Sequence, residues 1–154
     1  VGILGSVAAL FSRDDPDPLD ALSLGRWWDL EDRWDRAERF YRIAVDGLRE
    51  GSQWSWAARR YAQIRKRAGA RREVVNLWQR LWDDGEPWAG VEIAKYLEHE
   101  ARDIRAAAEV ARALLERATG ADRPEIEHRL AHGVADAQDI TAFGGWRAWL
   151  AARG

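Results

Sequence analysis

The sequence predicts an all-α fold: a short right-handed solenoid of three helical hairpins with a capping helix at each end. Three observations predict it. The helix formers Ala, Leu, Arg and Glu dominate the chain. No alternation of apolar β-branched and polar residues persists for five residues, so strands are not expected. Clusters of Gly, Pro and Asp cut the chain into segments of about 14 residues, a length that suits paired antiparallel helices.

Each expected helix has a signal at its start or its end. Asp17 is suited to cap a helix, and Pro18 fits the first helical position, where the missing N–H costs nothing. Asp122 and Glu125 have the spacing of a capping box, which opens another helix. The helices predicted from these signals cover residues 2–11, 18–31, 33–50, 53–68, 71–83, 88–101, 104–118, 123–132 and 145–152.

The length of 154 residues predicts a single domain with one core. The chain has no cysteine, which excludes disulfides, cysteine-type zinc sites and a thiol nucleophile. Its net charge of −2 is too small to indicate a protein that coats nucleic acid over its whole surface. The expected parts of residues 1–154 are a leading helix, three hairpin repeats, and a capping helix with a tail: 1–11, 18–50, 52–84, 87–118 and 122–154.

A repeat of about 35 residues runs through the three hairpins. A small residue on each first helix (Gly25, Ala62 and Ala94) lets the two helices of a hairpin approach each other. Small or β-branched residues are expected to meet them from the second helices, 37 and 33 residues apart: Ala37, Val74 and Ala107. Since each hairpin leaves one apolar face bare, stacking of the repeats would cover it.

The repeat resembles the tetratricopeptide repeat, in which a Leu-Gly pair precedes an aromatic residue and the second helix reads Ala-x3-aromatic-x2-Ala. The first hairpin matches this pattern from Leu24-Gly25 and Trp28 to Tyr41 and Ala44. The second departs at Arg65, where an aromatic residue is usual, and the third departs by one inserted residue and by Ala111. This resemblance implies a concave groove that binds a partner segment.

Two stretches are similar to the C-terminal helical region of YprB-type ribonuclease-H-like proteins. They are residues 93–99, Ile-Ala-Lys-Tyr-Leu-Glu-His, followed by an Arg-Asp turn, and residues 125–131, Glu-Ile-Glu-His-Arg-Leu-Ala. The resemblance implies an exonuclease-like catalytic domain upstream of Val1, with residues 1–11 as its last helix. The chain has no methionine, even at position 1. We therefore expect Val1 to be a cut point within a longer protein.

No group of residues in the sequence predicts catalysis, and no cofactor or metal is expected. Asp29-Leu30-Glu31 has the spacing of a nuclease metal motif, but it falls at a predicted helix end and not on a strand. His128 and His132 share a helix face, and a zinc site there would need His99 with Glu98 or Glu100 as its further ligands. Packing of His128 at a helix interface and exposure of His132 near a helix end explain the two histidines better. No serine lies in a Gly-x-Ser-x-Gly turn.

Charge and tryptophan are unevenly placed. Residues 59–80 hold eight basic side chains and one acid, a net charge of +7 that leaves −9 for the remainder.

Of the ten tryptophans, Trp28, Trp34 and Trp78 fall at core positions of the repeat. Trp56 and Trp88 are either packing residues between hairpins or hydrophobic anchors for a partner. The predicted partner-binding residues are Arg26, Trp56, Arg59, Gln63, Lys66, Arg67, Trp88, Lys95 and His99.

Two functions follow from these residues. The first is a non-catalytic protein-interaction scaffold that binds a protein segment or peptide, acidic in character, in the concave groove. The alternative is a nucleic-acid-binding accessory region of a ribonuclease-H-like nuclease, acting through the basic residues 59–80. The apolar run 1–11 is about half the length of a membrane span, so we expect no membrane partner and a cytoplasmic location.

Overall fold

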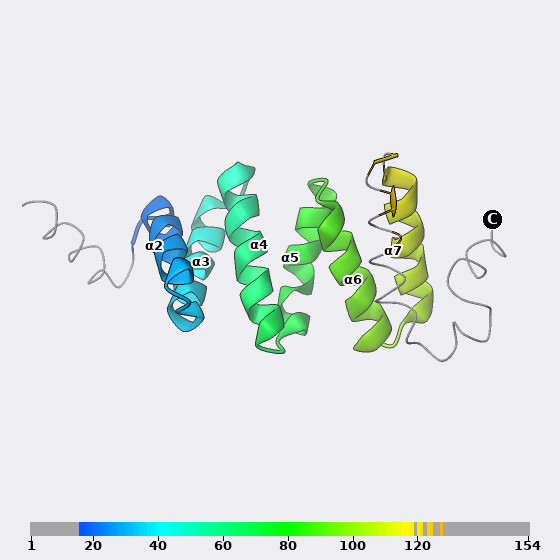
Figure 1. The fold of residues 1–154 in the computed structure, drawn as a ribbon, viewed down its shortest axis with the longest axis horizontal. Helices are drawn as coiled ribbons and strands as arrows, with labels where there is room; N and C mark the ends of the chain where they lie inside the picture. Colours follow the sequence, from blue (N-terminus) through cyan, green and yellow to red (C-terminus); the bar gives the residue numbers. More distant parts are fainter. Residues whose placement is uncertain (1–15, 119, 122, 125–126, 128–154) are drawn as a thin grey trace, which may run out of the picture. The chain divides into compact units, whose positions relative to one another are not determined.

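The computed structural model describes residues 16–118, 120–121, 123–124 and 127, and every regular element in them is helical (Figure 1). The all-α prediction is confirmed for this part of the chain. The predicted helices 2–11 and 145–152 and most of 123–132 lie outside the described residues. The helices are α2 (Pro18–Leu30), α3 (Trp34–Leu48), α4 (Gly51–Arg67), α5 (Arg71–Asp83), α6 (Pro87–His99) and α7 (Ile104–Arg117).

The helix boundaries follow local signals. The Asp17 carboxylate accepts the backbone N–H of Leu19 at 2.9 Å, and Pro18 is the first residue of α2, as predicted. Asp103 caps α7 in the same way, accepting the N–H of Ala106 at 2.9 Å, a cap that the sequence analysis did not identify. Gly69 and Gly85 follow α4 and α5 with φ of +79° and +93°, the left-handed backbone that favours glycine at a helix end.

The chain divides into two compact units, Val1–Val74 and Val75–Gly154, and the boundary falls within α5. The first unit contains α2, α3, α4 and the first turn of α5. The second contains the rest of α5 with α6 and α7. The stacking of three hairpins into one right-handed solenoid stays a prediction, and each unit is described separately.

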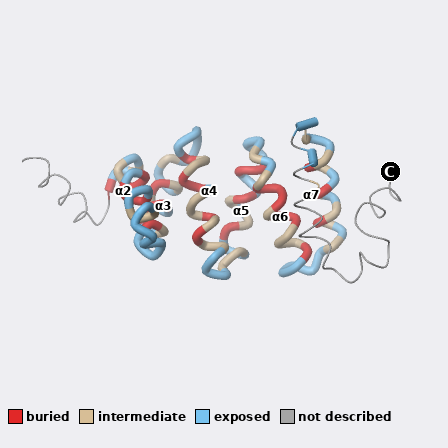
Figure 2. Tube along the Cα trace, in the orientation of Figure 1, coloured by how far each residue is buried: buried red, intermediate tan, exposed pale blue. Residues whose placement is uncertain are grey.

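In the first unit α2 packs against α3, and α3 packs against α4. Small and aromatic side chains form the core between them: Ala21, Ala37, Tyr41, Ala44 and Ala57 are fully buried. Figure 2 shows the buried stretches of α2, α3 and α4 in red. Gly25 allows a close approach, as predicted. A methyl group added there would lie 2.7 Å from two carbons of the Tyr41 ring, so the ring occupies the space that the glycine leaves open.

Two of the three tryptophans predicted to be core residues are less buried than expected. Trp78 is 1% exposed, as predicted, and Trp28 is half-buried. Trp34 is 41% exposed, so its assignment to the core is wrong. It is the first residue of α3, where its ring packs beneath the guanidinium of Arg67 at 4.6 Å from the ring centre instead of entering the core.

In the second unit α6 packs against α7. The predicted small anchors Ala94 and Ala107 are buried. Gly90, which the repeat pattern did not single out, also lies at a close contact between side chains and a helix backbone. A methyl group on Gly90 would lie 2.6 Å from the Trp82 ring and 3.0 Å from a Leu114 methyl carbon.

We expect Gly90→Ala to destabilise the protein by up to about 2 kcal/mol. Alanine is the better helix former by about 1 kcal/mol, but overpacking a filled core costs about 1–3 kcal/mol, so we expect the clash to prevail. Urea denaturation followed by circular dichroism measures the difference. Gly120→Ala is the control, because a methyl group added there meets no atom within 4 Å. A Gly90→Ala protein as stable as the control would contradict the close approach.

No helix among the described residues combines the length and the apolar character that crossing a membrane requires.

Candidate functional site

A pocket of about 410 Å³ opens on the first unit where α2, α3 and α4 meet. We call it the α2–α4 pocket. It is lined by three residues of α2, one of α3 and two of α4: Arg26, Asp29, Leu30, Tyr41, Trp56 and Arg60. These positions follow helical spacing, since residues 26, 29 and 30, and also 56 and 60, share a face of their helices. The pocket therefore arises from one face of α2 and one face of α4.

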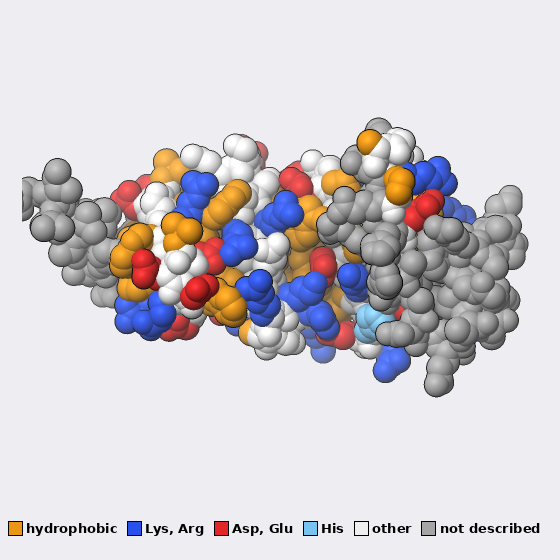
Figure 3. All heavy atoms as spheres, viewed as in Figure 1, with side chains coloured by type: hydrophobic (Ala, Val, Ile, Leu, Met, Phe, Trp, Pro, Cys, Tyr) orange, Lys and Arg blue, Asp and Glu red, His pale blue; other side chains and the backbone are white. Residues whose placement is uncertain are grey.

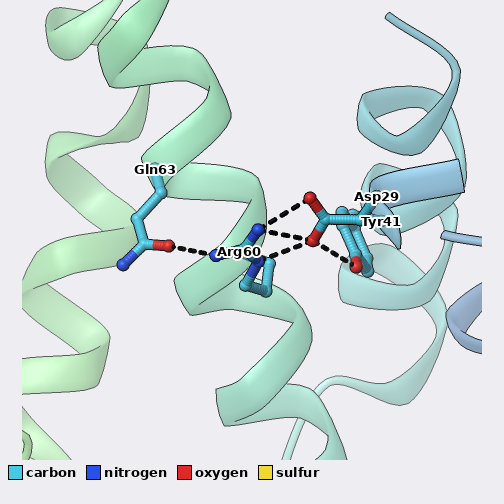
Figure 4. Close-up of polar contacts among 4 residues, drawn as sticks. All are labelled: Asp29, Tyr41, Arg60 and Gln63. Carbon is cyan, nitrogen blue, oxygen red and sulfur yellow. Dashed lines mark hydrogen bonds and ion pairs between the residues drawn. The ribbon is translucent and has the colours of Figure 1, made fainter. Parts of the chain in front are cut away.

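The floor of the pocket is an ion pair between α2 and α4 (Figure 4). Arg60 donates from Nε to one oxygen of Asp29 and from Nη2 to the other, each at 2.7 Å. The Asp29 side chain is 10% exposed and that of Arg60 is 31% exposed. This two-point contact holds both side chains in one geometry, which a single ion-pair contact would not do.

Two further side chains complete the floor. The Tyr41 hydroxyl donates to Asp29 at 3.0 Å, and Arg60 Nη1 donates to the side-chain oxygen of Gln63 at 2.9 Å. Burial raises the pKa of the Tyr41 phenol well above its usual value, and the Asp29 carboxylate adds to the effect. The phenol therefore remains a neutral hydrogen-bond donor throughout the physiological pH range.

The rim of the pocket combines one cation with apolar surface. The Arg26 guanidinium lies over the Trp56 ring at 4.3 Å from its centre. Trp56 in turn meets Tyr41 edge to face, with ring centres 5.6 Å apart. Leu30 is 83% exposed, the most exposed large apolar side chain of the described residues. On the face drawn in Figure 3, basic and hydrophobic side chains of the first unit are interspersed.

The pocket brings together some of the predicted site residues. Arg26 and Trp56 line it, and Gln63 supports its floor through Arg60. Arg59 and Lys66 lie on α4 outside the lining, and Arg67 covers Trp34. The other predicted residues belong to the second unit: Trp88, Lys95 and His99.

The predicted residues of the second unit lie on α6. Trp88 and Lys95 are half-buried, and His99 is exposed. The His99 Nε2 atom is 3.8 Å from a carboxylate oxygen of Glu98, which is itself 1% exposed.

Four pocket residues are absent from the predicted set: Asp29, Leu30, Tyr41 and Arg60. Asp29 fits the spacing of a metal motif, but in the structure its carboxylate accepts hydrogen bonds from Arg60 and Tyr41. Arg60 was passed over in favour of its neighbour Arg59. Helical spacing could have found it, because Arg60 is four residues after Trp56 and three before Gln63.

Arg65 stands where the tetratricopeptide repeat usually has an aromatic residue, and its contacts account for this difference. Its guanidinium donates to Glu38 of α3 at 3.0 Å and also to Glu73 in the first turn of α5. An ion-pair network thus joins three helices at a position where that repeat usually has an aromatic side chain. Arg60 and Arg65 are therefore both neutralised within the first unit, which reduces the positive charge that residues 59–80 offer to a partner.

A second pocket of the first unit, of about 430 Å³, is lined by Trp27, Trp28, Asp35, Arg36, Arg39 and Phe40. The Arg36 guanidinium covers the Trp28 ring at 4.3 Å, and Trp27 packs edge to face on Trp28. Among the described residues, no three His, Asp or Glu side chains gather closely enough to hold a metal ion.

The chain matches no protein-family model, no curated protein and no solved structure.

Proposed function

We propose that the protein is a non-catalytic interaction module that binds a segment of a partner protein in the α2–α4 pocket. The observation that carries the proposal is the combination of a fixed floor and an accessible rim. Asp29, Arg60 and Tyr41 hold one another in place, while Arg26 and Leu30 are exposed at the rim. A preorganised pocket loses little conformational entropy on binding, and Trp, Tyr and Arg are the side chains that most often dominate binding energy.

Binding fits the pocket better than catalysis. Both oxygens of Asp29 accept hydrogen bonds from Arg60, so this carboxylate is poorly placed to act as a general base. The Tyr41 phenol is buried and neutral. The lining contains no serine, threonine, histidine or lysine that could serve as a nucleophile.

The resemblance to the tetratricopeptide repeat supports the same proposal. In that repeat the first helices line a concave groove, and five of the six lining residues lie on α2 and α4, the first helices of the first two expected hairpins. We extend the proposal to a solenoid of three hairpins that forms the C-terminal part of a ribonuclease-H-like protein.

Nucleic-acid binding is the weaker candidate. It depends on the charge of +7 in residues 59–80. Arg60 is paired with Asp29, and Arg65 with Glu38 and Glu73, so at least two of the eight cations have acidic partners within the unit. A phosphate backbone binds mainly by neutralising such cations, and pairing them with acids weakens that attraction.

The proposal is tested by nuclear magnetic resonance on the ¹⁵N-labelled chain. The indole N–H signal of Trp56 is assigned by its loss in Trp56→Phe. Pools of short blocked peptides that contain acidic and apolar residues, and separately a single-stranded oligothymidylate, are titrated at low and moderate salt. We expect the peptide pools to shift the Trp56 signal and the oligonucleotide to leave it unchanged. A shift caused only by the oligonucleotide, with steep salt dependence, would favour the nucleic-acid alternative and overturn the proposal.

A further inference from the structure

We infer that the α2–α4 pocket recognises a partner segment carrying a single carboxylate beside an apolar side chain. This inference rests on the proposed function and names the chemistry of the ligand. Arg26 would bind the carboxylate, and Leu30 with Trp56 would bind the apolar side chain.

The lining of the pocket has one more basic than acidic side chain. The lining contains three charged groups, Arg26, Asp29 and Arg60. Asp29 and Arg60 neutralise each other, and all three nitrogens of the Arg60 guanidinium already donate hydrogen bonds, two to Asp29 and one to Gln63. The charge left for a ligand is therefore that of Arg26.

The placement of Arg26 suits a carboxylate. Its guanidinium lies with its carbon 4.3 Å from the centre of the Trp56 ring. A guanidinium that contacts an aromatic face can still donate hydrogen bonds from N–H groups along its edge, where a planar carboxylate accepts two in parallel. Contact with the ring also restricts the arginine side chain, so less conformational entropy is lost when the anion binds.

The single positive charge of Arg26 matches a ligand group with a single negative charge. A carboxylate carries a charge of −1, whereas a phosphate monoester carries about −1.5 to −2 at neutral pH. A second negative charge on the ligand would meet no further cation of the lining, because Arg60 is already paired with Asp29. The site should therefore prefer an aspartate or glutamate side chain to a phosphorylated one.

The apolar side chain of the ligand would contact Leu30 and Trp56, which lie beside Arg26 in the lining. Leu30 is 83% exposed, and Trp56 is half-buried between Arg26 and Tyr41. Covering Leu30 and the accessible part of Trp56 removes apolar surface from water, which favours a ligand side chain such as leucine over serine.

Four matched peptides test this ligand chemistry, with blocked ends so that only the side chains differ. They contain Glu next to Leu, Gln next to Leu, Glu next to Ser, and phosphoserine next to Leu. Dissociation constants come from titrations of the Trp56 indole signal. We expect the Glu-Leu peptide to bind tightest, about tenfold tighter than Gln-Leu, because hydrogen bonds to a charged group are stronger than those to a neutral one.

Substitutions in the protein test which pocket residue contacts the carboxylate and which contacts the apolar side chain of the peptide. Arg26→Gln should reduce the difference between Glu-Leu and Gln-Leu to less than about twofold. Leu30→Ser should reduce the difference between Glu-Leu and Glu-Ser. Arg42→Gln, which removes one exposed cation of α3 outside the lining, is the matched control and should leave both differences intact. Circular dichroism confirms that each variant is folded.

The outcomes separate this inference from the proposed function. If Glu-Leu and Gln-Leu bind equally and both shift the Trp56 signal, the inference that the pocket recognises a carboxylate is wrong. The proposed function as an interaction module would still hold. Tighter binding of the phosphoserine peptide also overturns the inference. If no peptide or peptide pool shifts Trp56, both the inference and the proposed function fail.

Discussion

We expect Tyr41→Ala to lower the free energy of unfolding by about 4 kcal/mol, the usual cost of truncating a fully buried aromatic side chain. Tyr41 is 0% exposed, and its ring fills the space beside Gly25 and packs edge to face with Trp56. Its hydroxyl also donates to Asp29. The substitution therefore removes a core side chain and a hydrogen bond of the pocket floor together.

Tyr41→Phe separates the two contributions. It keeps the ring and removes only the hydroxyl, so we expect a loss of about 1 kcal/mol, the net value of an ordinary hydrogen bond. Urea denaturation followed by tryptophan fluorescence and by circular dichroism gives both values. If Tyr41→Ala cost no more than Tyr41→Phe, the packing of the ring against α2 and α4 would be contradicted.

The second large effect concerns the ion pair of the pocket floor. We expect Asp29→Ala to cost about 2–3 kcal/mol, because it leaves the Arg60 guanidinium without its acidic partner. The expected value is below that of a fully buried pair, since the Arg60 side chain is 31% exposed and water can reach it.

A double substitution distinguishes the charge from the packing. Asp29→Ala with Arg60→Met removes both charges and keeps an apolar chain of similar length, so we expect most of the lost stability to return. Denaturation of the two single variants and the double variant yields the coupling energy between the two positions. Additive losses, with no recovery in the double variant, would show that the ion pair is not an energetic unit.

Much of the helical organisation could be predicted from local sequence. Asp17 and Pro18 begin α2 where expected, and α5 has the predicted bounds, 71–83. The other described helices end within two residues of the predicted positions. These boundaries are predictable because caps, proline and glycine act within one turn of the chain. Arg102, by contrast, takes φ of +56° before α7 without the glycine that would signal such a turn.

The candidate site was predicted only in part. The repeat pattern singled out Arg26 and Trp56, which line the pocket, and it singled out Arg59, whereas the lining contains Arg60. Successive residues on a helix point about 100° apart, so the rotation of α4 about its axis decides which of two neighbouring arginines lines the pocket. Trp34 illustrates the same limit, because a repeat position alone does not say whether a helix-terminal side chain reaches the core.

The sequence by itself determined that the described part of this protein is helical and where its helices begin and end. Propensity, capping and glycine placement act over a few residues, so they can be read along the chain. Only the tertiary structure decided that Asp29 meets Arg60, 31 residues away, and that Arg26 is left as the cation of the pocket without an acidic partner in its lining. Pairing between charges distant in sequence depends on how α2, α3 and α4 pack, and packing depends on side chains from all three helices at once.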